Sequence, residues 1–145
     1  MAHDILIVDD ESDIRLLIAG ILTDEGYEPR EAGDSDAALA AIRARQPSLV
    51  LLDIWLQGSA LDGMDLLAII RRDCPDLPIV MISGHGTVET AVSAIKQGAY
   101  DFIEKPFKSE RLLTVIDRAI EASRLRRENE DLRARLSRLE SSRQH

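Results

Sequence analysis

The sequence predicts an α/β protein with a flavodoxin-like, doubly wound parallel sheet of five strands in the order 2-1-3-4-5. Two observations support this fold class. Short, continuous runs of Ile, Val and Leu recur along the chain, as is typical of strands buried on both faces of a parallel sheet. Segments with helical spacing separate these runs, so that strand and helix alternate five times. Right-handed crossovers, which are almost obligatory for such units, then place helices on both faces of the sheet.

The predicted strands are short and most of them end in a polar residue. The apolar runs at 5–8, 49–52 and 79–82 are continuous and therefore predict central strands. Residues 28–32 form a weaker second strand, and residues 102–104 form the last one.

The predicted helices are recognised by apolar residues that recur on one face. In the first helix these residues stand at i, i+3, i+4, i+7 and i+8, and they are Ile14, Leu17, Ile18, Ile21 and Leu22. Gly26 is a suitable end for this helix, because glycine readily ends helices. Further helices are expected at 35–45, 64–72 and 88–95, and a long fifth helix begins near Ser109.

Composition indicates a cytoplasmic protein with one domain of ordinary size and some additional chain. The single cysteine, Cys74, permits no internal disulfide, which is typical of a reducing compartment. Asp4, Asp9 and Asp10 interrupt the apolar run near the N-terminus, so no signal peptide is expected. No stretch approaches the roughly 18 apolar residues that a membrane span requires. The net charge of -8 argues against a globular part that wraps nucleic acid.

Chemically capable side chains follow the predicted strands. Asp9 and Asp10 follow the first strand, Asp53 the third, Ser83 the fourth and Lys105 the fifth. Ligand sites of open parallel sheets lie at the carboxyl ends of the strands. The first and third strands are neighbours in the predicted order, so the three carboxylates converge and repel one another. A hard divalent cation relieves this repulsion, and Mg²⁺ suits a site with few protein ligands and several waters.

Each of these residues also has a simpler interpretation. The acid pair at 9–10 can cap the first helix, since carboxylates favour helix N-termini. Ser83 can be a helix cap before Thr87, and Lys105 can be a solvated lysine. Together, however, they form a set suited to phosphoryl transfer. A carboxylate can attack a phosphoryl group, and a metal ion, a lysine and a hydroxyl can neutralise and position it.

Four motifs in order resemble the receiver domain of two-component response regulators. They are VDDE at 8–11, LLDIW at 51–55, MISGHG at 81–86 and YDFIEKPF at 100–107, within a resemblance that covers about residues 4–122. The resemblance implies that Asp53 is the phosphoacceptor and that Lys105 binds the phosphoryl group. It also implies that Asp9, Asp10, Asp53 and the backbone carbonyl of Trp55 bind Mg²⁺, and that a sensor histidine kinase is the phosphodonor.

The same resemblance assigns a switch to Ser83 and Phe102. On phosphorylation the hydroxyl moves toward the phosphoryl group and the aromatic ring turns inward; the alternative is that Phe102 is only a core residue. The Lys105–Pro106 bond is expected to be cis, which proline permits at low cost. Trp55 and His85 flank the site, and we expect them to modulate the lifetime of the phosphorylated state unless they are simply exposed loop residues.

The loop after Asp53 departs from the usual receiver pattern. Gln57 stands where receivers usually have proline, and Asp62-Gly63 arrives two residues later than the usual Asp-Gly pair. The loop at 54–63 is therefore longer than usual. This form resembles the NtrX branch of the nitrogen-regulation (NtrC) family, and SGHGTVETAVSAIKQGAYDFIEKPF is typical of the wider family.

Residues 123–145 are predicted to form a helical linker, and its heptad pattern indicates a coiled coil. The a positions hold Ala122, Asn129 and Leu136, and the d positions hold Leu125, Leu132 and Leu139. Leucine at d with a lone asparagine at a favours a parallel two-stranded coiled coil. Opposite charges face each other across such a dimer, in the pairs Glu121 with Arg126, Glu128 with Arg133, and Arg135 with Glu140. A solvated single helix and a basic DNA-contacting tail are the alternatives.

The sequence thus predicts a phosphorylation-controlled receiver at 1–122 and a helical linker at 123–145. It is not expected to be a classical enzyme, because it turns over only its own phosphoryl group. We expect a homodimer through the linker and the face of the fourth helix, fifth strand and fifth helix. The output domain, of the sigma-54-type transcription regulators, is expected to lie outside this chain.

Two rival functions remain open. One is a Mg²⁺-dependent phosphatase of the haloacid dehalogenase type, although such enzymes usually carry a second aspartate where Trp55 stands. The other is a stand-alone or phosphorylation-independent dimerisation module.

Overall fold

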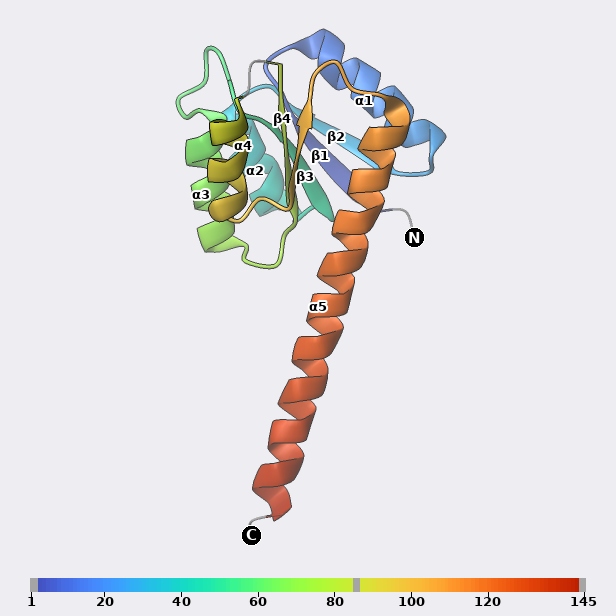
Figure 1. Cartoon of the computed structure of the whole chain (residues 1–145), viewed down its shortest axis with the longest axis vertical. Coiled ribbons are helices and arrows are strands. Elements are labelled where there is room, and N and C mark those ends of the chain that lie inside the picture. Colours follow the sequence, from blue (N-terminus) through green and yellow to red (C-terminus); the bar gives the residue numbers. More distant parts are fainter. Residues whose placement is uncertain (1–2, 85–86, 144–145) are drawn as a thin grey trace.

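The computed structural model, which describes residues 3–84 and 87–143, has one sheet of five parallel strands in the order β2-β1-β3-β4-β5. This is the predicted order, and helices cover both faces of the sheet (Figure 1). The strands are β1 (Asp4–Val8), β2 (Glu28–Ala32), β3 (Leu49–Asp53), β4 (Ile79–Ser83) and β5 (Asp101–Glu104). The helices are α1 (Ser12–Asp24), α2 (Ser35–Ala44), α3 (Gly63–Asp73), α4 (Val88–Lys96) and α5 (Ser109–Arg143).

Two apolar cores lie on opposite faces of the sheet. On one face α1 and α5 pack through residues such as Ile18 and Ile116, and on the other face α2, α3 and α4 pack through residues such as Leu67 and Ala94. All residues of β3 and β4 are buried, as the continuous apolar runs predict. The central strands are therefore fixed from both sides, which holds their carboxyl ends in one place.

Glycine follows two of the helices, at Gly26, where the sequence predicts a helix end, and at Gly98. Gly26 follows α1 with a φ of 87°, and Gly98 follows α4 with a φ of 108°. Both values lie in the left-handed region that glycine adopts without steric cost. After these two glycines the chain continues into β2 and β5, respectively.

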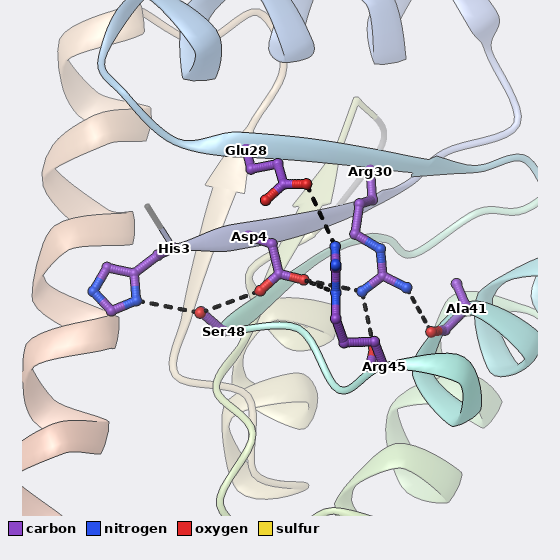
Figure 2. Close-up of polar contacts among 7 residues, drawn as sticks. All are labelled: His3, Asp4, Glu28, Arg30, Ala41, Arg45 and Ser48. Atoms are coloured by element: carbon purple, nitrogen blue, oxygen red, sulfur yellow. Dashed lines mark hydrogen bonds and ion pairs between the residues drawn. The ribbon is translucent and has the colours of Figure 1, made fainter. Parts of the chain in front are cut away.

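The amino end of the sheet carries a polar network around Asp4 (Figure 2). The Arg30 guanidinium donates to the Asp4 carboxylate at 3.0 Å and also to the backbone carbonyls of Ala41 and Arg45, at 2.6 and 2.9 Å. Arg45 forms a second ion pair with Asp4 at 3.4 Å. Arg30 thereby adds a second donor to the Ala41 carbonyl, which also accepts the Arg45 N–H at 3.2 Å, and supplies a donor to the carbonyl of Arg45 at the C-terminus of α2.

Helix α5 continues without interruption well beyond the globular body (Figure 1). Ser123 is buried and donates a hydrogen bond to the backbone carbonyl of Asp76 at 3.0 Å. From residue 124 to residue 141 every residue is exposed, including Leu125, Leu132, Leu136 and Leu139. Among the residues that the structure describes, no helix is both long and apolar enough to cross a membrane.

Candidate functional site

Three carboxylates converge at the carboxyl end of the sheet, as the strand order predicts. The register pairs Val8 with Leu52, so that Asp9 lies beside Asp53 in the neighbouring strand. Asp9, Asp10 and Asp53 each offer an oxygen, and these oxygens lie within 4.8 Å of one another. Asp9 and Asp53 are buried, whereas Asp10 is partly exposed. Such a spacing allows a single ion to contact all three side chains.

The backbone following each strand fixes one oxygen of the two buried carboxylates. The Glu11 N–H donates to Asp9 Oδ1 at 2.9 Å, and the Trp55 N–H donates to Asp53 Oδ1 at 3.3 Å. The residue at the N-cap position of α1 is Glu11, and its side chain makes no capping hydrogen bond. Neither Asp9 nor Asp10 occupies that position, so neither carboxylate is the N-cap residue of α1.

Lys105 brings a positive charge into the acidic cluster. Its Nζ lies 2.9 Å from Asp9 Oδ2 and 3.5 Å from Asp53 Oδ2. Burial disfavours the ammonium form, but the hydrogen bond to Asp9 and the charges of Asp53 and Asp9 outweigh burial and raise the pKa of Lys105. The Lys105 N–H donates to the Ser83 carbonyl at 2.9 Å, which holds the lysine at the end of β5. This lysine is therefore a fixed cation and not a solvated one.

The site carries more negative charge than the lysine neutralises. Burial and then the charge of Asp9 raise the pKa of Asp53 to about 6, although Lys105 and the Trp55 N–H act in the opposite direction. A carboxyl with a raised pKa signals an environment that disfavours its charged form. The donor set is three carboxylates, which are the hard oxygen ligands that Mg²⁺ prefers. The residues present therefore fit a divalent cation.

Ser83 and Phe102 lie on β4 and β5, two neighbouring strands, of which β4 also pairs with β3. Ser83 is the last residue of β4 and is buried, while Phe102 is partly buried and pairs with Met81 in the sheet register. Thr87, and not Ser83, caps α4, because its side chain accepts the Thr90 N–H. The Lys105–Pro106 bond is cis, as expected. His85, to which the sequence assigns an effect on the phosphorylated lifetime, lies outside the described residues.

Comparison with known proteins shows the family to which the chain belongs. A family model described as the response regulator receiver domain matches residues 5–117. The chain belongs to the response regulator receiver family. Its position in that family agrees with the resemblance that the four strand-end motifs predict.

Relatives of the receiver include NtrX proteins. This receiver is 65% identical over 133 residues to the nitrogen assimilation regulatory protein NtrX of Azorhizobium caulinodans. The match covers 92% of this chain and 29% of that protein. The crystal structure of NtrX from Brucella abortus in complex with ADP superimposes with a TM-score of 0.88 at 67% identity, over 91% of this chain and 30% of that one. The receiver thus spans about 30% of the length of these NtrX proteins. The predicted resemblance to the NtrX branch is confirmed.

A dimeric receiver is also similar in structure. The solution structure of the beryllofluoride-activated NtrC4 receiver domain dimer matches with a TM-score of 0.78 at 40% identity. This match covers 83% of this chain and 98% of the NtrC4 chain. A receiver domain with the same fold therefore forms a dimer.

The loop after β3 is anchored to the receiver's site by Gly63. The Gly63 N–H donates to the Ile54 carbonyl at 2.8 Å, and a Cβ at this position would lie 2.1 Å from the Asp53 carbonyl oxygen. Only glycine permits this approach of α3 to the end of β3. Asp62 accepts the Asp65 N–H and caps α3. The late Asp-Gly pair therefore both begins α3 and closes the loop.

Sequence reasoning missed one contributor to the site. The Arg15 guanidinium of α1 donates to the backbone carbonyl of Asp9 at 2.6 Å and forms an ion pair with Glu31 at 3.3 Å. It thus ties α1 and β2 to the turn that carries the acid pair. The partner is a backbone carbonyl, so no pattern of side chains in the sequence indicates the contact.

Proposed function

We propose that this receiver accepts a phosphoryl group on Asp53 from a sensor histidine kinase and thereby switches an output process. The observation that carries this proposal is the placement of Asp53 beside both the acidic pair and Lys105, at the carboxyl ends of β1, β3 and β5. The ionised Asp53 carboxylate attacks phosphorus, a P–O bond to Asp53 forms, and the donor takes the electron pair of the bond that breaks. With a pKa of about 6, Asp53 is mostly ionised at pH 7, and a bound cation would favour the ionised form further.

Asp9, Asp10, Asp53 and the Trp55 carbonyl would hold Mg²⁺ in this proposal. The ion supplies neutralisation of the negative charge on the phosphoryl oxygens and the carboxylates. Asp9 is already oriented by the Glu11 N–H, and Arg15 fixes its backbone, so two of its polar groups are positioned before any ion binds.

Lys105 and Ser83 would recognise the phosphoryl group once it is attached. The Lys105 ammonium, now paired with Asp9 and Asp53, is close enough to Asp53 to contact an oxygen of its phosphoryl group. The Ser83 hydroxyl at the end of β4 would donate a hydrogen bond to another oxygen. Phe102, which packs beside the core in the neighbouring strand, would repack when Ser83 moves.

Intact mass after incubation with acetyl phosphate and Mg²⁺ tests the proposal. We expect one phosphoryl group on the wild type and none on Asp53→Asn, while Asp65→Asn on the first turn of α3 labels like the wild type. An unlabelled wild type, even with its cognate kinase, would support a phosphorylation-independent dimerisation module. Labelling of Asp53→Asn would show that another residue is the acceptor.

We further propose that the receiver forms a homodimer through α4, β5, α5 and the C-terminal coil. Val88, Val92 and Ile95 of α4 are exposed, at 80%, 46% and 43%. The leucines at 125, 132, 136 and 139 are each more than half exposed and form the predicted heptad stripe. Arg124 forms pairs with Glu121 and Glu128 within one helix, both at 2.5 Å, and these acids are the ones assigned to contacts between chains.

Sedimentation of the full chain and of a chain that ends at Ala122 tests the coil. We expect a dimer for the full chain and a weaker dimer or a monomer for the shortened one, because the leucine stripe is lost. Leu132→Arg, which places a charge at a d position, should have the same effect as truncation. Equal monomeric masses for both chains would exclude the coil.

The remaining parts of the proposed function concern the cell. A cytoplasmic location fits a single unpaired cysteine, Cys74, and a kinase that phosphorylates from the cytoplasmic side. Similarity to NtrX supports nitrogen regulation through a transcriptional output domain.

Trp55, which is half exposed beside Asp53, would slow hydrolysis of the acyl phosphate. Trp55→Asn should therefore shorten the lifetime of the acyl phosphate, and an unchanged lifetime would exclude this role.

A further inference from the structure

The long loop after β3 forms a wall beside the phosphorylation site. Its side chains alternate, since Ile54 and Leu56 are buried in the core under α2, α3 and α4 while Trp55 between them is half exposed. A hollow of about 310 Å³ on one side contains Asp10, Asp53 and Lys105. A second hollow, of about 280 Å³, lies against Leu56 and Asp62. Trp55 and Gln57 line both hollows and therefore separate them.

Beyond this wall the loop is attached to the start of α2. The Ser35 N–H donates to the Ser59 hydroxyl at 2.8 Å, and the Leu61 N–H donates to the Ser35 hydroxyl at 3.2 Å. Ser35 is fully buried, so these bonds are shielded from competing water. Gly58, with a φ of 71°, turns the chain between the wall and this attachment. We call the pair of bonds the Ser35–Ser59 clamp.

We propose that the Ser35–Ser59 clamp positions the wall of Trp55 and Gln57 and so sets how readily water reaches an acyl phosphate on Asp53. The inference rests on the proposed function of Asp53. The two serines touch no reacting atom, and they act as positioning residues through the loop. The clamp engages the added part of the loop, where the usual proline is replaced by Gln57, so a hydrogen-bonded attachment takes over the role of a rigid residue.

The clamp has a physical reason to control the wall. At its near end the wall is fixed by the buried Ile54 and Leu56, and at its far end only the turn at Gly58 separates it from Ser59. Loss of the Ser59 hydroxyl leaves the Ser35 N–H without its acceptor in a buried position, which favours an open loop that water can solvate. We expect the open population, and with it the hydrolysis rate, to rise about fivefold for one such bond.

Four variants of the full chain test the proposal. Ser59→Ala and Ser35→Ala each remove one hydroxyl of the clamp, and Ser59→Thr retains a hydroxyl. Ser48→Ala is the matched control, because it removes a hydroxyl that bonds to Asp4 at the opposite end of the sheet. Acrylamide quenching of Trp55, the single tryptophan, reports the wall without phosphorylation. The decay of the acyl phosphate, formed with acetyl phosphate and Mg²⁺, reports water access.

The proposal predicts stronger quenching and about fivefold faster decay for both clamp variants, and values close to wild type for Ser59→Thr and Ser48→Ala. Unchanged decay in Ser59→Ala and Ser35→Ala would overturn it, as would equally fast decay in Ser48→Ala. If wild-type Asp53 takes no label, the proposed function fails, and unchanged quenching in the clamp variants would then overturn the positioning of the wall separately.

Discussion

An aspartate lies at each end of β1, and the two carboxylates differ in how far nearby cations compensate their charge. At the amino end Asp4 pairs with Arg30 and Arg45 and accepts a bond from Ser48 (Figure 2). At the carboxyl end Asp9 shares the single ammonium of Lys105 with Asp53, while Asp10 lies nearby. The first arrangement neutralises its charge with protein groups and stabilises the fold. The second leaves negative charge uncompensated, which destabilises the fold, and it is the end to which we assign the cation and the phosphoryl group.

Removing Arg30 should produce the largest change at the amino end. Arg30→Met retains much of the apolar stem but removes the less exposed cation of the part-buried Asp4, together with the hydrogen bonds to the carbonyls of Ala41 and Arg45. We expect the free energy of unfolding in urea to fall by about 3 kcal/mol. A loss as small as that of an exposed ion pair would show that this end does not depend on charge compensation.

Replacing Asp53 should change the free energy of unfolding in the opposite direction, toward greater stability. Burial and the charge of Asp9 disfavour its ionised form, so Asp53→Asn should raise the free energy of unfolding at pH 7 without Mg²⁺ by about 1–3 kcal/mol. The same urea denaturation measures it. A destabilised Asp53→Asn would contradict the view that this end holds uncompensated charge.

The advantage of Asp53→Asn should depend on pH. The folded-state pKa of Asp53 is about 6 and its ordinary value is 3.8, so the folded protein binds the proton more tightly than the unfolded chain. The stability that the protonated group contributes is fully present below pH 3.8 and is lost as the pH rises through about 6. The difference between Asp53→Asn and wild type should therefore shrink between pH 7 and pH 4. A difference that is constant over this range would assign it to packing.

The fold was largely predictable from the sequence, whereas the conformation of the loop at 54–63 was not. Continuous apolar runs in β3 and β4 require burial on both faces, which left few alternatives for the sheet. The edge strand β2 gave a weak signal, because its sequence EPREA is mostly polar and its place depends on pairing with β1. Asp9, Asp53 and Lys105 were predictable because strand order alone brings them together.

The contacts that the sequence did not indicate share a physical cause. Arg15 donates to a backbone carbonyl, and the hydroxyls of Ser59 and Ser35 each accept a bond from a backbone N–H group. Every residue offers such backbone groups, so the sequence contains no complementary side chain that would mark the pair. Their positions follow only when α1, α2 and the long loop are packed on the sheet.

Arg45 should give the smallest effect and sharpen the comparison with Arg30. Both guanidiniums reach Asp4, but the Arg45 side chain is 59% exposed and that of Arg30 only 18%. Arg45→Ala should change the free energy of unfolding by no more than about 0.5 kcal/mol, because water and salt screen exposed pairs. A loss equal to that of Arg30→Met would show that burial does not decide the contribution.

Thermal denaturation with and without Mg²⁺ tests the contrast between the two ends most directly, in wild type, Asp53→Asn and Asp4→Asn. We predict that Mg²⁺ stabilises the wild type and has little effect on Asp53→Asn, which is already the more stable of the two without the ion. Asp4→Asn should be less stable than wild type and should keep the full response to Mg²⁺. Loss of that response in Asp4→Asn, or its retention in Asp53→Asn, would contradict the account.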